Sequence, residues 1–204
     1  MIRTILIFDD KDPDMGAYFA GCAHNVKVQS NGLMAELIEI RSQNLTAAYL
    51  NSTIENLNGS KFLCIVYSHG SKKSFLANEA FIVEGDTERF SNSIFYTFSC
   101  HTGNDVGADI IRKGCSLFWG YTSKASFVVG YLSIFVDCAN FGIIKLFQGE
   151  TSGNAYVAMK EYYNNQIDAL YKSDYFAASI LMENRDGMIL RGRWDIRLSD
   201  FLAA

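Results

Sequence analysis

The chain alternates between short, unbroken apolar runs and longer segments in which apolar residues recur every three or four positions. The unbroken runs cover residues 4–8, 62–67, 94–98 and 116–121. A central parallel strand is buried on both faces, so it is continuously apolar rather than alternating. These four runs therefore predict buried parallel strands.

Helical spacing is clearest late in the chain, over residues 127–147 and 152–171. Another helix is expected over about residues 104–112, where Asn104 or Asp105 supplies the N-terminal cap. Together with the four strands, these segments give an alternating order of strand and helix.

Weaker patterns complete the prediction. In the first half we expect a helix over 15–23, a strand over 26–29, a helical segment over 33–57 and a hairpin over 74–83. Near the end we expect strands over 177–183 and 188–190 joined by the turn 184–187, and an edge pairing over 194–198.

Strands that alternate with helices predict an α/β fold, in which helices cover both faces of a mostly parallel sheet. No linker, internal repeat or low-complexity tract interrupts the pattern. We therefore expect residues 1–204 to form a single domain.

Composition narrows the class of protein. The chain has 204 residues, of which 49% are hydrophobic, and a net charge of −4 with its basic residues scattered. A packed globular protein is expected, and nucleic acid is not an expected partner. The five cysteines are odd in number and form no C-x-x-C pair, which favours a reducing, cytoplasmic location.

Membrane insertion is not expected either. Residues 128–147 are strongly apolar but are interrupted by Asp137, Asn140 and Lys145, and a charge in the middle of a span is costly. The chain also reaches Asp9 and Asp10 before any long apolar run, so no signal peptide is expected. The apolar segment is interpreted as a core helix.

Two of the predicted strands are followed by reactive side chains, His69 after residues 62–67 and Cys100 after residues 94–98. In parallel sheets, functional groups gather at the carboxyl ends of the strands. Consecutive strands are usually neighbours, about 4.8 Å apart. We therefore expect the thiol and the imidazole to lie within reach of one another.

The setting of Cys100 suits a nucleophile. It precedes a predicted helix start, where free N–H groups and the helix dipole stabilise a thiolate, and a nearby imidazole can take its proton. The backbone N–H groups of Gly70 and Cys100 are candidates for an oxyanion hole.

These residues also fit other kinds of site. His101 is a rival base, but it adjoins Cys100 and should point away from the thiol, so it is expected to shape the pocket. Asp9 and Asp10 at a strand end also fit a phospho-acceptor domain, which needs a further Asp where this chain has Ser68. A zinc site is not expected because Cys64, His69, Cys100 and His101 lack paired spacing. No metal and no cofactor are expected.

Two motifs carry a resemblance to a known group: Tyr67-Ser68-His69-Gly70 and Phe98-Ser99-Cys100-His101-Thr102-Gly103. They resemble the His-Gly and Ser-Cys-His-Ser-Gly motifs of metacaspases and other caspase-like cysteine peptidases of clan CD. The order of elements is also similar over residues 1–183. Residues 146–149 and the helix over 155–160 resemble the CHAT domains of that clan.

The resemblance implies a caspase-like sandwich with about six strands and an endopeptidase that cleaves a protein substrate. It implies a Cys–His dyad without an obligatory third member: Cys100 as nucleophile, His69 as base and acid, and Gly70 as an oxyanion donor. Relatives of this kind cleave a few targets in signalling, defence or cell death. A regulatory protein partner acting in trans is therefore expected.

One departure from the resemblance concerns the substrate. Metacaspases have an acidic residue two positions before the cysteine, which binds Arg or Lys at P1, whereas this chain has Phe98. Burying an unpaired cation is costly, so we expect an uncharged, hydrophobic P1 residue unless Asp9 or Asp10 reaches the pocket. Ser99 and His101 are also assigned to substrate binding.

Two other functions stay open. The chain could be a catalytically silent caspase-like module that serves as a scaffold, or a cysteine hydrolase of small amides on a similar sheet.

Overall fold

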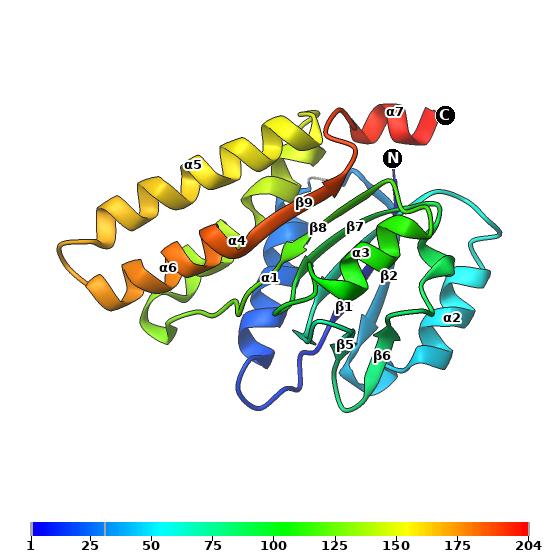
Figure 1. Cartoon of the computed structure of the whole chain (residues 1–204), viewed down its shortest axis with the longest axis horizontal. Coiled ribbons are helices and arrows are strands. Elements are labelled where there is room, and N and C mark those ends of the chain that lie inside the picture. The colour runs from blue at the N-terminus through cyan, green and yellow to red at the C-terminus, as the bar shows by residue number, and fades with distance from the viewer. Residues whose placement is uncertain (1, 31, 204) are drawn as a thin grey trace.

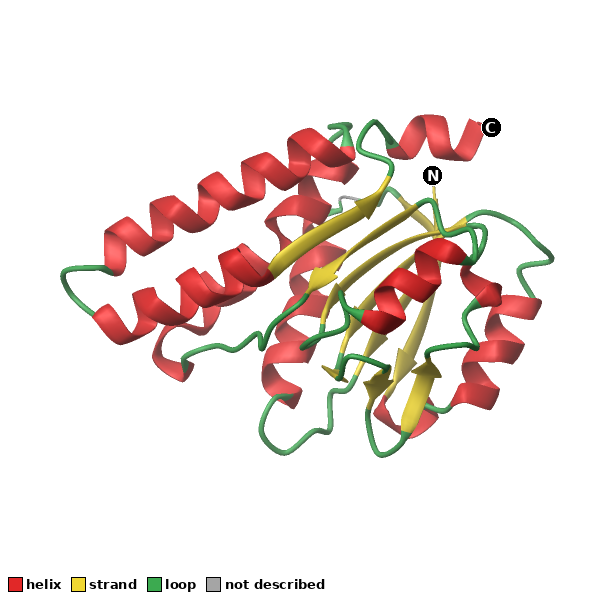
Figure 2. Cartoon of the chain, viewed as in Figure 1, coloured by secondary structure: helices red, strands yellow, loops and turns green. Residues whose placement is uncertain are grey.

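The structure is a computed structural model that describes residues 2–30 and 32–203. Its main element is a six-stranded sheet with the spatial order β2-β1-β3-β7-β8-β9 (Figure 2). The strands are β1 (Ile2–Phe8), β2 (Met34–Arg41), β3 (Phe62–Tyr67), β7 (Ser93–Phe98), β8 (Leu117–Tyr121) and β9 (Met188–Gly192). The first five pair in parallel and β9 runs antiparallel to β8, so the prediction of a mostly parallel six-stranded sheet is confirmed.

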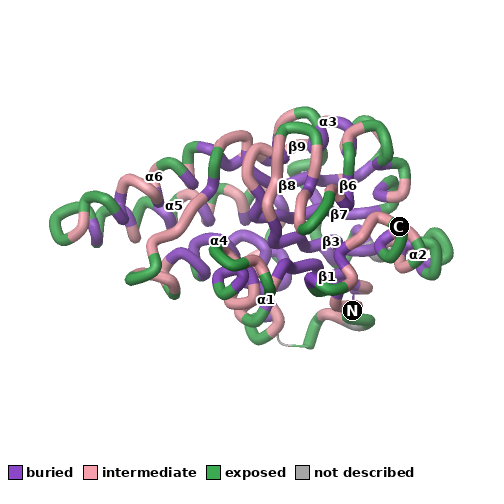
Figure 3. The backbone as a smooth tube through the Cα atoms, turned by 90° about the horizontal axis from the view of Figure 1, so that it is seen from below, coloured by how far each residue is buried: buried purple, intermediate pink, exposed green. Residues whose placement is uncertain are grey.

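Helices cover both faces of this sheet (Figures 1 and 3). One face carries α1 (Gly16–Gln29) and α4 (Leu132–Phe147); α5 (Ser152–Leu170) packs on α4, and α6 (Tyr175–Gly187) packs on α5, so that these two helices extend past the β9 edge. The other face carries α2 (Ala47–Glu55) and α3 (Asp105–Arg112). The chain ends in α7 (Leu198–Ala203). Single 3-10 turns lie at Ser42–Asn44, Glu88–Phe90 and Val129–Tyr131.

The predicted hairpin over residues 74–83 is confirmed as β5 (Ser74–Leu76) and β6 (Ala80–Val83). Together with β4 (His69–Gly70) it forms a second, three-stranded antiparallel sheet. This small sheet begins where β3 ends, so it holds the backbone that follows the central strand.

Each face of the main sheet has its own apolar core, and β3 contributes to both. Leu63, Ile65 and Tyr67 face the core under α1 and α4, and the residues between them face the core under α2 and α3. Side chains of a strand alternate between its two faces. Burying one large apolar side chain stabilises a fold by about 1.5–3 kcal/mol, which explains why the central runs are unbroken.

The prediction of a helix over residues 33–57 is wrong in its first half. Residues 34–41 form β2, whose Ile38 pairs with Ile5 of β1, and the α-helix covers residues 47–55. The apolar spacing there fits both a helix and an edge strand, and pairing with β1 decides between them.

The predicted strand over residues 26–29 is the end of α1. Val26 is buried and Val28 is exposed, as expected for two residues that lie about 200° apart around a helix.

Residues 177–183 belong to α6, not to a strand, because Asp174 caps this helix by accepting a hydrogen bond from the Ala177 N–H at 2.9 Å. The strand predicted to follow is confirmed as β9.

The edge pairing over 194–198 is also wrong. The carbonyls of Trp194 and Ile196 instead accept hydrogen bonds from the backbone N–H groups of Gly153 and Ser152, which have no partner inside α5 because they lie at its start.

Residues Val129–Phe147 form a helical segment that is long and apolar enough to span a membrane, and 44% of it is buried inside the fold. Its helix α4 packs against α1 and α5 (Figure 1). This agrees with the interpretation of the segment as a core helix.

Candidate active site

Strand register brings His69 and Cys100 together. β3 and β7 are the two middle strands, and they pair in parallel with Tyr67 beside Phe98. His69 lies two residues beyond the end of β3, and Cys100 lies two residues beyond the end of β7. Both side chains lie on the α1 face, because His69 packs against Phe19 of α1 and Cys100 packs against the same core.

Gly70 lies directly against the backbone of Cys100. A Cβ atom at this position would come within 2.6 Å of the Cys100 carbonyl oxygen and 2.5 Å of Thr102 Cγ2. Any larger residue would push these two segments apart. The glycine that follows the histidine therefore allows the two strand ends to approach closely.

The Cys100 thiol contacts the loop that follows β8. Its Sγ lies 3.4 Å from both the carbonyl oxygen and the amide nitrogen of Ala125. Cys100 is half-buried, whereas the other four cysteines are fully buried. Burial raises the pKa of Cys115 to about 11 and the pKa values of Cys22, Cys64 and Cys138 still further. Cys100 is thus the accessible thiol in the described part of the chain.

The imidazole of His69 contacts a residue that the sequence did not single out. Its Nε2 lies 2.9 Å from Oδ2 of Asp12, and the His69 side chain is 43% exposed while that of Asp12 is 14% exposed. Within residues 2–30 and 32–203, no hydrogen bond joins His69 to Cys100. A signal for Asp12 was available, because it follows β1, the strand beside β3.

Asp12 is itself held firmly. Its other oxygen, Oδ1, accepts the backbone N–H groups of Met15 at 2.7 Å and Asp14 at 3.0 Å. Burial raises the pKa of Asp12, but these two N–H groups and His69 outweigh it, and the pKa lies below its ordinary value. The carboxyl group is therefore ionised at neutral pH.

The loop that contacts the thiol is fixed by α6. Asn184 accepts the Ser126 N–H at 2.9 Å and donates to the Ser126 carbonyl at 2.7 Å, and the Thr122 N–H donates to the Gly187 carbonyl at 2.8 Å. Asn184 is buried. Residues 184–187, which the sequence predicted as a hairpin turn, are instead the end of α6, and Asn184 there binds the loop.

His101 faces the end of β8. Its Nδ1 donates to the Thr122 carbonyl at 3.2 Å, and its backbone N–H donates to the Ser123 carbonyl at 2.9 Å. Its φ of 61° lies in the left-handed region, which costs a non-glycine residue roughly 1–2 kcal/mol. The strained turn directs the chain from Cys100 towards α3 and holds His101 at the end of β8.

Phe98 and Ser99 are both buried beneath the site. Phe98 packs edge-on against Tyr18 and Tyr121, each with ring centroids 5.0 Å apart, and Ser99 lies 3.3 Å from Ser68 on the other face. The expectation of direct substrate contact is corrected for these two residues, because neither offers surface to a ligand in this conformation.

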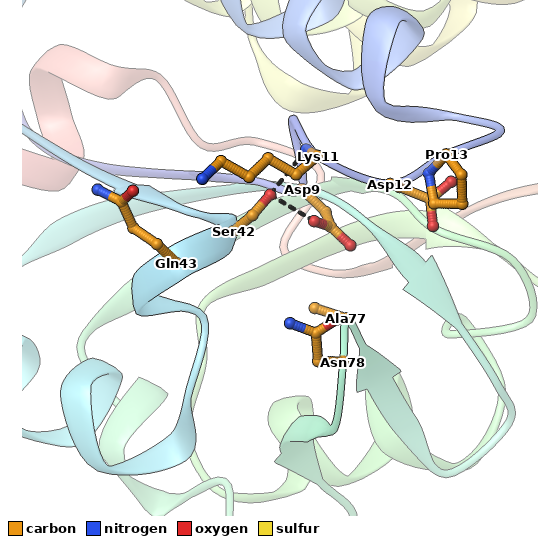
Figure 4. A pocket seen from close by; sticks show the side chains of 8 residues that line it. All are labelled: Asp9, Lys11, Asp12, Pro13, Ser42, Gln43, Ala77 and Asn78. Atoms are coloured by element: carbon orange, nitrogen blue, oxygen red, sulfur yellow. Dashed lines mark hydrogen bonds between the residues drawn. The ribbon is translucent and has the colours of Figure 1, made fainter.

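Asp9 and Asp10 lie on the far side of β1 from the thiol, where Ser42 Oγ contacts Asp9 Oδ1 at 2.5 Å and Asp10 Oδ1 at 2.9 Å. Asp9 lines a polar cavity of about 260 Å³ that the β5–β6 turn faces (Figure 4). The same cavity touches Asp12. Since β3 separates β1 from β7, Asp9 is about 10 Å across the sheet from Cys100.

Two backbone N–H groups beside the thiol are free of the sheet. The backbone N–H of Ser71 donates a hydrogen bond to the Ser74 carbonyl at 2.8 Å, so Ser71 and Ser74 are a hydrogen-bonded pair of the β4–β5 ladder. Hydrogen-bonded and non-hydrogen-bonded pairs alternate along an antiparallel ladder. The next pair, Gly70 and Phe75, is therefore not hydrogen-bonded. The N–H of Gly70 therefore points away from β5. The N–H of Cys100 has no hydrogen-bond partner among the residues described.

No group of three or more His, Cys, Asp or Glu side chains that could hold a metal ion occurs in the described residues.

Comparisons with known proteins support the fold. No family model matches the sequence, and no curated protein matches it. Among solved structures, the chain is similar to the Arg-specific cysteine proteinase gingipain R, with a TM-score of 0.61 and 14% sequence identity. The match covers 96% of this chain and 47% of that chain, so this chain spans about half the length of gingipain R. Gingipain R is a clan CD cysteine peptidase with a caspase-like fold, and at this identity the similarity concerns the fold.

Proposed function

We propose that the chain is a cysteine endopeptidase in which Cys100 is the nucleophile and His69 the general base and acid. The observation that carries the proposal is the register of β3 and β7, which sets these two residues side by side at the carboxyl edge of the sheet. The fold shared with a cysteine proteinase supports it.

The proposed reaction has two halves. His69 takes the thiol proton, and the Cys100 thiolate attacks the scissile carbonyl carbon, so that a C–S bond forms and the oxygen becomes negative. The N–H groups of Gly70 and Cys100 bind this oxyanion, an interaction that typically contributes about 3–4 kcal/mol. His69 then protonates the leaving amine. In the second half, it deprotonates a water that hydrolyses the acyl-enzyme.

We extend the proposal to the P1 residue, which we expect to be uncharged and hydrophobic. The side chains beneath the thiol are aromatic: Phe98 packs on Tyr18, which stacks on Phe127 at 4.5 Å. Phe98 and Tyr18 are buried, whereas Phe127 is partly exposed, and a cation placed against Phe127 would lose water without gaining a carboxylate. In this respect the chain would differ from gingipain R, which is described as Arg-specific.

The biological setting remains as the sequence predicts it. We propose cleavage of a specific protein target in the cytoplasm, within a signalling, defence or cell-death pathway and under the control of a partner protein.

A covalent peptidyl probe directed at thiols tests the chemistry. We expect the wild-type chain to be labelled at Cys100 and Cys100→Ala to be unlabelled. Peptide mapping supplies an internal control, because Cys64 and Cys115 are buried and should stay unmodified in the same sample. A wild-type chain that no peptidyl probe labels, although it is folded, would contradict the proposal.

Proteomics of new N-termini tests the specificity. Cells that express wild type are compared with cells that express Cys100→Ala, and fragments found only with wild type identify the target and its P1 residue. Consistent cleavage after Arg or Lys would rule out the uncharged P1.

A second candidate is a silent caspase-like module that binds a partner without cleaving it. The Cys100 thiol contacts Ala125 and makes no hydrogen bond with His69 among the described residues, which favours this alternative. In that case the probe would not label Cys100, and wild type and Cys100→Ala would capture the same partner equally well.

A further inference from the structure

We propose that Asp12 is a positioning residue for His69, which it holds in the tautomer that carries hydrogen on Nε2. This makes Nδ1 the basic nitrogen. The inference rests on the proposed function for its use in catalysis, but the tautomer is a property of the resting protein.

The contact between Asp12 and His69 fixes the position of the hydrogen on the imidazole. An ionised carboxylate can only accept hydrogen bonds. Because Asp12 Oδ2 lies 2.9 Å from His69 Nε2, the hydrogen between them belongs to Nε2. A neutral imidazole carries one hydrogen, so Nδ1 is left with a free lone pair. The same carboxylate stabilises the imidazolium that forms when Nδ1 accepts a proton.

The carboxylate is positioned before any substrate arrives. One oxygen is fixed by the N–H groups of Met15 and Asp14, which leaves the other to face His69. The backbone carbonyl of Asp12 accepts the N–H of Gly16 at 3.0 Å, which ties the residue to the start of α1. An anion is favoured at a helix N-terminus.

The same helix also contacts the imidazole. Phe19 of α1 presents its ring to His69 with centroids 5.8 Å apart and an interplanar angle of 83°. Asp12 in the loop before α1 and Phe19 in the first turn of α1 thus both contact the ring. The base is oriented by α1, while the nucleophile is carried by β7.

The tautomer is tested by nitrogen NMR on the full chain labelled with ¹⁵N-histidine. The chain has three histidines, so His24→Gln and His101→Gln identify the signals of His69. We expect hydrogen on Nε2 in wild type. In Asp12→Asn the amide keeps an oxygen for Met15 and Asp14 but donates its N–H₂ to Nε2, so the hydrogen should move to Nδ1.

Asp14→Asn is the matched control. It removes an exposed carboxylate from the same loop and should leave the tautomer unchanged. Circular dichroism confirms that each variant is folded. A His69 that carries hydrogen on Nδ1 in wild type, or on Nε2 in folded Asp12→Asn, would overturn the proposal.

Probe kinetics connect the tautomer to catalysis. We expect Asp12→Asn to label about 100-fold more slowly or worse, with its pH profile displaced, because the corresponding Asp→Asn change in a Ser–His–Asp triad costs about 10⁴ through the wrong tautomer. Asp14→Asn should stay close to wild type. If the tautomer changes but wild type is never labelled, the peptidase proposal fails while the role of Asp12 stands. If wild type is labelled and Asp12→Asn labels equally fast, the role of Asp12 fails alone.

Discussion

The imidazole and the thiol are held by different kinds of interaction. His69 is paired with an ionised carboxylate that is itself fixed by two backbone N–H groups. The sulfur of Cys100 makes two 3.4 Å contacts with the backbone of Ala125. Charge-assisted hydrogen bonds are roughly twice as strong as neutral ones, and sulfur is a weak partner.

This difference shows where the site is rigid and where it can adapt. The imidazole is held by Asp12 in the loop before α1, whereas the thiol rests against a loop that depends on Asn184 of α6. A substrate would displace weak sulfur contacts but leave the carboxylate pair in place. Substitutions on the imidazole side should therefore have larger effects than substitutions on the thiol side.

The largest effect is expected on the imidazole side. His69→Ala should lower the rate of probe labelling about 10²–10⁴-fold, the range typical of losing a general base. His101→Ala is the control, because His101 bonds to Thr122 at the end of β8. Equal losses in the two variants would show that His101 shares the role of base.

The next largest effect is expected where Gly70, beside the imidazole, contacts the backbone of Cys100. In Gly70→Ala the new Cβ would meet the Cys100 carbonyl, so the strand ends must separate, and a shift of about 1 Å can cost 100-fold in rate. Gly130→Ala is matched to it, because a Cβ there has nothing within 4 Å. Steady-state kinetics or labelling rates compare the two, and unchanged activity in Gly70→Ala would refute the close contact.

A smaller effect is expected on the thiol side. Asn184→Ala removes two hydrogen bonds to Ser126 and should destabilise the fold by about 2 kcal/mol. The loop over Cys100 then loosens, so iodoacetamide should modify Cys100 several-fold faster. Urea unfolding and alkylation rates measure these changes, with the exposed Glu183→Ala on the same helix as a control. Slower alkylation would mean that the loop orders the thiol rather than covering it.

The smallest effect concerns pH and stability. The pKa of Asp12 is lower in the folded protein than in the unfolded chain, where it is about 3.9, so ionised Asp12 stabilises the fold. The contribution is complete above the unfolded pKa and disappears as pH falls through the folded pKa. Urea midpoints of wild type and Asp12→Asn should differ at pH 7 and converge once the pH has fallen below the folded pKa. A constant difference would mean that Asp12 acts through something other than its charge.

The sequence predicted the centre of the sheet better than its margins. Residues 62–67 and 94–98 are apolar throughout because both of their faces are buried, and β3 and β7 match them closely. β2 lies at the edge with one half-exposed face, so its apolar residues also fit helical spacing. Pairing with β1 is a long-range interaction that local spacing does not contain.

The residues of the candidate site also differ in how far the sequence could predict them. His69 and Cys100 could be proposed from the sequence because each lies two residues after a predicted central strand. Asp12 lies 57 positions from His69 in a loop, and only the folded course of that loop brings them together. Phe98 was interpreted as a pocket residue from its spacing to Cys100, but the aromatic rings of Tyr18 and Tyr121 enclose it.

The position of β3 and β7 in the middle of the sheet also bears on how the protein opens. Local unfolding begins where backbone hydrogen bonds are exposed, and in this sheet that means the outer strands β2 and β9. Fraying of either strand leaves the register between β3 and β7 intact. Amide hydrogens of these two strands should therefore exchange with deuterium last, and a chain that has lost an edge strand should still present His69 and Cys100 side by side.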